Sequence, residues 1–395
     1  MAQIQRKKQR IARILRYLQR RPEIYSPYSL PAARIVLHTE GRHFFEAIFT
    51  AIDEARQLIC LEYYRVSADS TGKKLADLLA AAAGRGVSVF LIYDAIGCHK
   101  TPDSYFEELA LNGINCIAFN PLSFRKIAWF DRRDHRKLAI FDGNLAFLGG
   151  MNIADEYAGI GEAASRYHDV GFSLQGKAAA ALLSHFSEIW RLETGRIPPL
   201  PELDNTETVQ PESSAKIAFV TGGPHQRRSA IRAAFRIAMA SAADEILIAN
   251  PYFIPGPMIT RSLLRAAKRG VMIRLLLPAI SDVPIVKLLS RSTYSQLLAA
   301  GIEIFELERE MLHAKIMYID GERTVIGSAN MDQRSFHRNF EINAIIASQS
   351  FAAQIKSLFE NDFKNSKKIT EDHHSRRGWL AIILERMLRP ISWFL

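Results

Sequence analysis

Two short polar motifs of the same spacing stand out in this sequence. Each follows the pattern His-x-Lys-x4-Asp and is followed, at the same distance, by an asparagine in a segment of small residues. The members are His135, Lys137, Asp142 and Asn152 in the first copy and His313, Lys315, Asp320 and Asn330 in the second. One such pattern alone is weak evidence, because His and Lys often lie on exposed strands. Two copies indicate a repeated functional unit.

These side-chain types suit a phosphodiester substrate. Residues two apart on a strand point to the same face, so each histidine shares a face with its lysine. Lysine ammonium and asparagine amide groups can hold the nonbridging oxygens of a phosphate. One neutral histidine can attack phosphorus, while the other, protonated, gives its proton to the leaving alkoxide. We therefore expect both His–Lys–Asn sets to be catalytic around one central cleft.

Carboxylates beyond each motif are candidates for orienting the histidines. A catalytic imidazole needs a partner that fixes its tautomer. Asp169 follows the first motif and Glu341 follows the second, both in strand-like sequence, and we assign them this role. Asp142 and Asp320 stand directly before glycines, which predicts structural positions in hairpin turns rather than catalysis.

The order of predicted elements indicates an α/β fold. The strand patterns Arg56–Arg65 and Val87–Asp94 enclose an Ala/Leu-rich helix at Gly72–Gly84. This order favours a mostly parallel or mixed sheet with covering helices. Similar segments recur in the second half at a nearly constant offset, which indicates an internal duplication. The proline-rich segment at Arg196–Ser214 has the composition of a linker.

We therefore divide the chain into five parts. They are a basic amphipathic helix (1–22), a first lobe (23–195), a linker (196–214), a second lobe (215–370) and a C-terminal amphipathic segment (371–395). Both terminal parts combine an apolar stripe with basic residues, and the C-terminal one adds tryptophans. They are expected to bind an anionic membrane surface, although packing against the protein body is an alternative for each.

The bulk composition agrees with a phosphate-rich partner but does not identify it. Lys and Arg number 51 against 41 Asp and Glu, which gives a net charge of +10. Anionic lipid and nucleic acid both fit this charge. No segment reads as a transmembrane helix or a secretory signal. We expect a peripheral or monotopic protein on the cytoplasmic face of the cell membrane.

Substrate contacts are expected from an insertion and from two matched strand ends. The segment Pro121–Asp134 is longer than its counterpart in the second half and contains Trp129 and Phe130. It is a candidate lid or headgroup contact, with an ordinary surface loop as the alternative. The strand-end residues are Glu62 and Tyr63 in the first half and Asn250 and Tyr252 in the second. They are weaker candidates, and core packing is the alternative for the tyrosines.

The paired motifs resemble the signature of the phospholipase D superfamily, from Val36 to Phe363. Within it, the chain resembles bacterial cardiolipin synthases of the short type, which lack N-terminal transmembrane helices. The similarity includes the segments Ile248–Pro257 and Asp282–Val286. It implies two α-β-α sandwich lobes, a phosphohistidine intermediate, and neither metal nor cofactor. Both motif histidines, lysines and asparagines would line the active site.

The resemblance also implies a phosphatidyl transfer. Cardiolipin would be made from phosphatidylglycerol or phosphatidylethanolamine as the donor and a lipid alcohol as the acceptor. The alternatives are a hydrolase or nuclease of the same superfamily, or a non-catalytic membrane scaffold. The apolar faces of the terminal segments favour lipid over nucleic acid, because DNA binding has no need of them.

Overall fold

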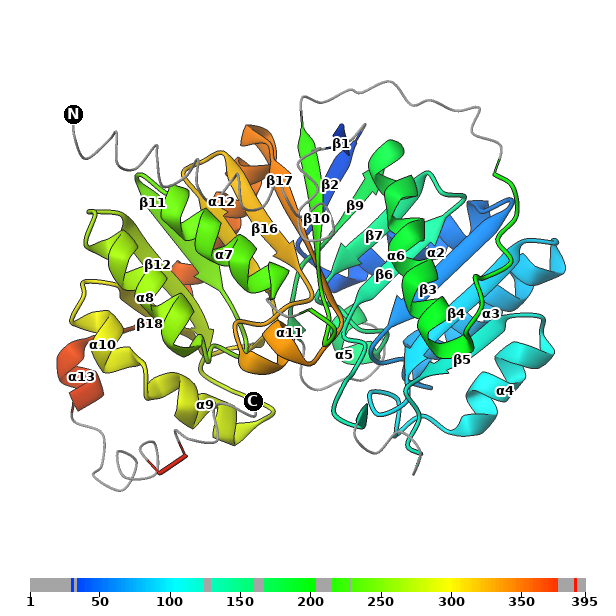
Figure 1. The fold of residues 1–395 in the computed structure, drawn as a ribbon, viewed down its shortest axis with the longest axis horizontal. Helices are drawn as coiled ribbons and strands as arrows, with labels where there is room; N and C mark the ends of the chain where they lie inside the picture. The colour runs from blue at the N-terminus through cyan, green and yellow to red at the C-terminus, as the bar shows by residue number, and fades with distance from the viewer. Residues whose placement is uncertain are drawn as a thin grey trace. The chain divides into compact units, whose positions relative to one another are not determined.

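The computed structural model describes residues 30–31, 34–123, 129–159, 167–203, 215–226, 229–375 and 387–388. The chain forms two compact units that divide between Lys216 and Ile217 (Figure 1). We call Leu30–Lys216 the first lobe and the described residues from Ile217 onward the second lobe, and each is considered by itself.

The first lobe contains a seven-stranded mixed sheet. Its strands lie in the order β2-β9-β7-β6-β3-β4-β5. β3, β4 and β5 are parallel, whereas β6 runs antiparallel to β3 and β7, and β9 runs antiparallel to β7 and β2. The bounds are β2 (Ile35–His38), β3 (Leu58–Tyr63), β4 (Ser88–Asp94), β5 (Asn115–Phe119), β6 (Lys137–Phe141), β7 (Leu145–Gly149) and β9 (Gly171–Gln175), with the short strands β1 (Leu30–Pro31) and β8 (Tyr167–His168) in addition.

Helices cover both faces of this sheet. The helices are α2 (Gly41–Glu54), α3 (Ser70–Gly84), α4 (Asp103–Leu111), α5 (Asp155–Ala158) and α6 (Lys177–Thr194). α2 and α3 pack together over one face, and α6 lies on the other. On α2, Phe44, Ile48 and Ile52 recur every four residues and are buried in the main core, as expected for one face of a helix. Every residue of β3 is buried because helices cover it on both sides.

The second lobe repeats this order. Its strands run β10-β17-β16-β15-β11-β12-β13-β18, so each strand of the first lobe has a counterpart and β18 is an addition. The bounds are β10 (Lys216–Gly222), β11 (Glu245–Ala249), β12 (Met272–Pro278), β13 (Glu303–Leu307), β14 (Met311–Leu312), β15 (Ile316–Ile319), β16 (Arg323–Gly327), β17 (Glu341–Ala347) and β18 (Ser366–Ile369). The repeat confirms the predicted α/β fold of two duplicated lobes.

The covering helices of the second lobe are arranged like those of the first. They are α7 (Ala230–Ser241), α8 (Gly256–Ala267), α9 (Pro284–Arg291), α10 (Tyr294–Leu298), α11 (Gln333–His337), α12 (Gln349–Lys364) and α13 (Glu371–Ser375). α7 and α8 pack together as α2 and α3 do, and α12 packs along several strands as α6 does. Among the described residues, no helix is long and apolar enough to cross a bilayer.

Several predicted boundaries differ from the structure. The predicted strand Arg56–Arg65 is shorter, at Leu58–Tyr63, and the predicted helix begins earlier, at Ser70. The terminal segment 1–22 and most of 376–395 lie outside the described residues, as does much of the linker 196–214. Met387 and Leu388 are the described residues of the C-terminal segment beyond Ser375.

Candidate active site

Each motif aspartate stands in a hairpin turn, between β6 and β7 or between β15 and β16. Asp142 and Asp320 have positive φ angles of 48° and 51°, a conformation that aspartate tolerates better than most residues. Each carboxylate accepts hydrogen bonds from three successive backbone N–H groups, at distances between 2.7 and 2.9 Å. The donors are Arg56, Gln57 and Leu58 for Asp142, and Ala243, Asp244 and Glu245 for Asp320. This geometry supports the structural role that the Asp-Gly pairs predict.

The first motif histidine lies just before its strand rather than within it. β6 begins at Lys137, whose ladder partner Tyr63 is the last residue of β3, so pairing ends before His135. Both motif side chains are buried, and the Lys137 Nζ donates to the backbone O of His135 at 2.7 Å. The ring of Tyr64 meets the imidazole edge-on, with 5.0 Å between centroids, and lies 5.2 Å from the Lys137 ammonium.

The small residues before Asn152 leave room for a carboxylate. A Cβ on Gly150 would lie 2.5 Å from both carboxylate oxygens of Asp169, which is closer than real Cβ contacts. Asp169 Oδ1 also accepts from the backbone N of Val170 at 2.8 Å. The amide of Asn152 donates to the hydroxyl of Tyr157 on α5 at 3.0 Å. A Cβ at position 150 would therefore displace the Asp169 carboxylate from its observed position.

The second motif brings its lysine into contact with the imidazole. Lys315 Nζ lies 2.9 Å from His313 Nδ1 and also donates to the histidine backbone O. An ammonium group has donors only, so Nδ1 accepts in this contact. Both side chains are buried, and β15 begins just after them at Ile316. As in the first lobe, the histidine lies outside the ladder, because the partner strand β11 ends at Ala249, opposite Ile316.

Side chains hold the carboxylate for which the sequence predicts an orienting role in the second lobe. Glu341 is fully buried at the start of β17. Its Oε2 accepts from Ser328 Oγ at 2.5 Å, and its Oε1 accepts from Asn339 Nδ2 at 3.4 Å. Ser328 stands where the first lobe has Gly150, and Glu341 where it has Asp169. The Ser328 hydroxyl donates to the longer Glu341 side chain, whereas Gly150 leaves space for the shorter Asp169 side chain.

A hydrogen-bonded turn fixes the segment that contains Asn330. Its backbone N donates to Ser335 Oγ at 3.1 Å, and the next residue, Met331, donates to Asn250 Oδ1 at 3.1 Å. Asp332 caps α11 by accepting from the Ser335 backbone N at 2.7 Å. Burial, together with the nearby charge of Glu341, raises the pKa of Asp332 to about 7. Our sequence analysis missed Asp332 and Ser335, although Asp-x-x-Ser is a recognisable N-cap pattern.

The predicted headgroup contacts at the strand ends have other partners. Glu62 pairs with Leu138 in the ladder while Tyr63 pairs with Lys137, so Glu62 points to the opposite face of the sheet from the motif lysine. It is fully buried with its Oε1 3.7 Å from Arg136 Nη1. Burial and the adjacent Asp134 raise the pKa of the Glu62 carboxyl well above its usual value. This placement does not support headgroup binding by Glu62.

The other three strand-end candidates also make contacts within their own lobes. Asn250 is buried and supports the Asn330 segment as described above. Tyr63 is buried in the main core of the first lobe, and the neighbouring Tyr64 is the ring beside His135. The hydroxyl of Tyr252 donates to the carboxylate of Asp282 at 2.7 Å. Tyr64, and not Tyr63, therefore lies beside the motif histidine. The sequence pattern did not show which of the two tyrosines would do so.

The insertion candidates Trp129 and Phe130 are exposed, at 42% and 55%. Residues 124–128, also part of the predicted insertion, lie outside the described residues. In the described part of the chain, no group of three or more His, Cys, Asp and Glu side chains is arranged to hold a metal ion.

Comparison with known proteins agrees with this geometry. A family model described as cardiolipin synthase, PLD-like domain, matches residues 48–190 and 235–363, one match in each lobe. A cardiolipin synthase of Geobacillus thermodenitrificans is 36% identical over 367 residues, which cover 93% of this chain and 73% of the relative. Cardiolipin synthase A of Pseudomonas syringae pv. syringae is 33% identical over 95% of this chain and 78% of its own length.

Solved structures show the same fold at low sequence identity. Phosphatidylserine synthase of Haemophilus influenzae superimposes with a TM-score of 0.73 at 14% identity, over 96% of this chain and 97% of the other. Polyphosphate kinase of Porphyromonas gingivalis gives a TM-score of 0.59 at 14% identity, over 92% of this chain and 53% of the other. The duplicated lobes, the paired motifs and these matches together show that the chain belongs to the cardiolipin synthase family of phospholipase D-like proteins.

Proposed function

We propose that this protein is a phosphatidyltransferase that makes cardiolipin. The observation that carries the proposal is the buried His–Lys pair, which occurs once in each lobe with an asparagine segment and a buried carboxylate beside it. Such a set has a use in phosphodiester chemistry, whereas a membrane scaffold would gain nothing from burying it. The relatives named cardiolipin synthase give the lipid class of the substrate.

The proposed reaction has two displacement steps at phosphorus. In the first, one motif histidine forms a P–N bond with the phosphatidyl group while the P–O bond to the headgroup breaks. The other histidine gives its proton to the leaving alkoxide. In the second, a lipid alcohol gives its hydroxyl proton to that neutral histidine and attacks phosphorus, which breaks the P–N bond. Phosphatidylglycerol or phosphatidylethanolamine serves as the donor, and glycerol or ethanolamine leaves.

Each remaining group has a role in this scheme. Lys137 and Lys315 offset the negative charge that develops on the nonbridging oxygens, and Asn152 and Asn330 donate to the same oxygens. Asp169 and Glu341 orient the histidines that act on phosphorus. The scheme requires both motif histidines to reach the same phosphorus atom. It uses no metal or cofactor.

We further propose peripheral attachment to the cytoplasmic face of the membrane through the terminal segments. The basic helix predicted at 1–22 and the Trp-containing segment at 371–395 have the composition of interfacial helices. Leu388 packs against a small apolar cluster of Ile254, Val286 and Leu289, whereas Met387 is exposed. The first contact fits the alternative in which part of the C-terminal segment packs against its own lobe.

Product analysis tests the proposed reaction. Purified protein would be incubated with phosphatidylglycerol vesicles, with or without phosphatidylethanolamine, and the lipids resolved by mass spectrometry. The proposal expects diphosphatidylglycerol together with free glycerol, or ethanolamine where that lipid is the donor. Quenching with denaturant at mildly alkaline pH during turnover should leave the phosphatidyl group on a histidine, because the P–N bond is labile to acid, and peptide mass spectrometry would detect it. Phosphatidic acid as the main product would indicate a hydrolase instead, and cleavage of single-stranded DNA without lipid turnover would indicate a nuclease.

A further inference from the structure

An apolar surface lies on the chain just before the first motif histidine. Leu122, Trp129 and Phe130 expose 73%, 42% and 55% of their surface. They belong to the segment 119–134, which connects β5 to the motif. Contiguous exposed apolar patches mark interaction sites, and here Trp129 and Phe130 are adjacent in the chain. Nothing in the proposed transfer chemistry accounts for them.

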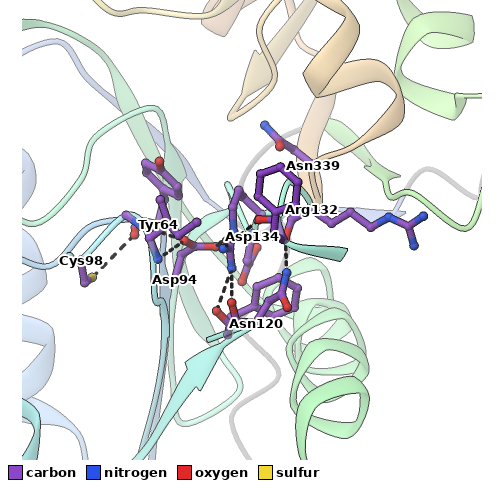
Figure 2. Close-up of polar contacts among 12 residues, drawn as sticks. Tyr64, Asp94, Cys98, Asn120, Arg132, Asp134 and Asn339 are labelled. Atoms are coloured by element: carbon purple, nitrogen blue, oxygen red, sulfur yellow. Dashed lines mark hydrogen bonds and ion pairs between the residues drawn. The ribbon is translucent and has the colours of Figure 1, made fainter. Parts of the chain in front are cut away.

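The two described parts of this segment are joined at its base. Asn120 donates through Nδ2 to the backbone O of Trp129 at 2.7 Å and of Arg132 at 2.9 Å (Figure 2). The left-handed backbone at Asn120, with φ of 44°, turns the chain so that its amide reaches across. Leu122 is only two residues beyond this link. Leu122 on one side, and Trp129 and Phe130 on the other, therefore lie within two residues of this hydrogen-bonded link.

A buried ion pair anchors the loop to the sheet. Arg133, 2% exposed, donates through Nε to Asp94 Oδ2 at 3.0 Å and through Nη2 to the backbone O of Asn120 at 2.7 Å. The same carboxylate oxygen accepts from the backbone N of Asp134 at 2.9 Å, so one carboxylate holds the residue next to His135 (Figure 2). Asp94 also accepts from two backbone N–H groups through Oδ1. The base of the loop is fixed relative to the catalytic motif.

The second lobe has no ion pair like Asp94–Arg133 in the described chain that leads to its motif histidine. β4 and β12 have the same length, and the position of Asp94 at the end of β4 is taken by Pro278 at the end of β12. The chain from the end of β13 at Leu307 to His313 is also shorter than the chain from Phe119 to His135. The anchored apolar loop is a property of the first lobe.

The side-chain types at the loop favour a lipid bilayer as the partner. Tryptophan is enriched at the headgroup level of membranes, and phenylalanine and leucine are common on the apolar face of interfacial helices. The guanidinium of Arg132 stacks 3.7 Å from the centroid of the Trp129 ring, which places a positive charge beside the aromatic surface. Arginine can lie over apolar surface while its charged end stays near anionic headgroups. An aromatic and cationic surface of this kind complements an anionic bilayer.

We propose that Leu122, Trp129 and Phe130 insert into the interfacial layer of an anionic lipid bilayer, and that the Asp94–Arg133 pair holds this contact at a fixed distance from His135. The choice of lipid as the partner rests on the proposed function. The depth of this insertion determines how far the lipid headgroups lie from His135. It is a contact separate from the terminal segments, which lie mostly outside the described residues.

Tryptophan fluorescence tests the insertion with a readout that does not depend on turnover. The chain contains four tryptophans, Trp129, Trp190, Trp379 and Trp393. Replacing Trp379 and Trp393 by phenylalanine leaves Trp129 and the buried Trp190. With mixed phosphatidylglycerol and phosphatidylcholine vesicles carrying brominated acyl chains, the emission should shift to the blue and be quenched. A further Trp129→Phe replacement supplies the background from Trp190. Protein that co-sediments with the vesicles but shows no quenching of Trp129 would overturn the proposal.

Vesicle partitioning of matched variants gives a second measure. Trp129→Ala with Phe130→Ala should weaken partitioning about tenfold, which corresponds to roughly 1.4 kcal/mol. The control pair, Leu111→Ala with Ile197→Ala, removes apolar side chains that are 88% and 72% exposed elsewhere in the first lobe, and should change partitioning less than twofold. Equal losses in both pairs would contradict a specific contact. Because neither readout needs catalysis, a failure of the proposed transfer reaction would be seen separately in the product analysis.

Discussion

The two lobes carry the same histidine, lysine and asparagine but support them in different ways. Behind the first motif strand, on the face turned away from the lysine, lies a buried charged cluster. In the second lobe the matched positions are apolar or neutral. The cluster residues are Glu62, Asp134 and Arg136, and their counterparts are Ala249, Leu312 and Ala314. A duplicated fold can therefore keep the same motif residues while the supporting interior diverges, because different sets of contacts can hold a side chain in the same position.

The carboxylates beside the asparagine segments differ in the same way. The first lobe combines a glycine with an aspartate, and the second combines a serine with a glutamate. Each pair places a carboxylate against the chain just before the asparagine. We therefore expect that replacing one residue of a pair by its counterpart from the other lobe disturbs the position of the carboxylate in that lobe.

The largest expected effect is the loss of either motif histidine. His135→Ala and His313→Ala should each lower the turnover number by at least three orders of magnitude, because nucleophile and acid act as a unit. Initial rates of lipid turnover, with circular dichroism to verify folding, would measure this. A folded variant that keeps more than a tenth of the wild-type rate would show that one lobe suffices.

Exchange of the small residue next to the carboxylate should have the next largest effect. Gly150→Ser would bring a Cβ within 2.5 Å of the Asp169 oxygens, and we expect a loss of kcat/KM of about tenfold to a hundredfold. Ser328→Gly removes one hydrogen bond to Glu341 and should cost less. Gly84→Ser is the control, since a Cβ there meets nothing within 4 Å. An unaffected Gly150→Ser enzyme would mean that Asp169 does not need its observed position.

The turn aspartates should affect stability equally in both lobes and catalysis little. Asp142→Asn and Asp320→Asn each weaken three charge-assisted hydrogen bonds, which should lower the free energy of unfolding by about 2–3 kcal/mol. Thermal melting and the activity per folded molecule would separate the two effects. Asp77→Asn, on the exposed side of α3, is the matched control. An unchanged melting temperature with lost activity would assign these residues to the chemistry.

The smallest expected effect is a pH dependence that belongs to the first lobe's charged cluster. Burial raises the pKa of Asp134 to about 7, so the folded protein holds a proton that the unfolded chain releases near pH 4. This contribution to stability is present at low pH and is lost as the pH rises from about 4 to 7. Asp134→Asn keeps the neutral form. The free energy of unfolding of the wild type should therefore fall relative to that of the variant by about 1 kcal/mol per pH unit over this range.

Denaturant unfolding at several pH values between 4.5 and 7.5 would measure that difference. The variant Asp77→Asn again serves as the control, since its side chain is exposed. Parallel curves for wild type and Asp134→Asn would mean that Asp134 is already ionised in the folded state, with Arg136 as its counter-ion.

Much of the fold could be predicted from the sequence, because strands, helices and turns depend on residues close together in the chain. The duplication could be predicted because similar segments recur at a nearly constant offset. The spacing of the two motifs, the strand–helix order and the Asp-Gly turns predicted the duplicated α/β fold, which the structure confirms. The family assignment is also confirmed. The catalytic and orienting roles of the site residues remain predictions, to which the structure adds burial and hydrogen-bond partners.

Only the tertiary structure decided which side chains face one another. Glu62 and Tyr63 are neighbours in sequence, yet the ladder register turns Glu62 toward Arg136 and Tyr63 into the core of the first lobe. Tyr64, the next residue, lies beside His135. Asn250, just beyond the distant strand β11, accepts a hydrogen bond from Met331, and Asp94 anchors a loop that ends at the first motif. A sequence pattern shows the period at which apolar residues recur within one segment. The face to which a side chain points, and whether its charge is buried, depend on the register and packing of segments far apart in the chain.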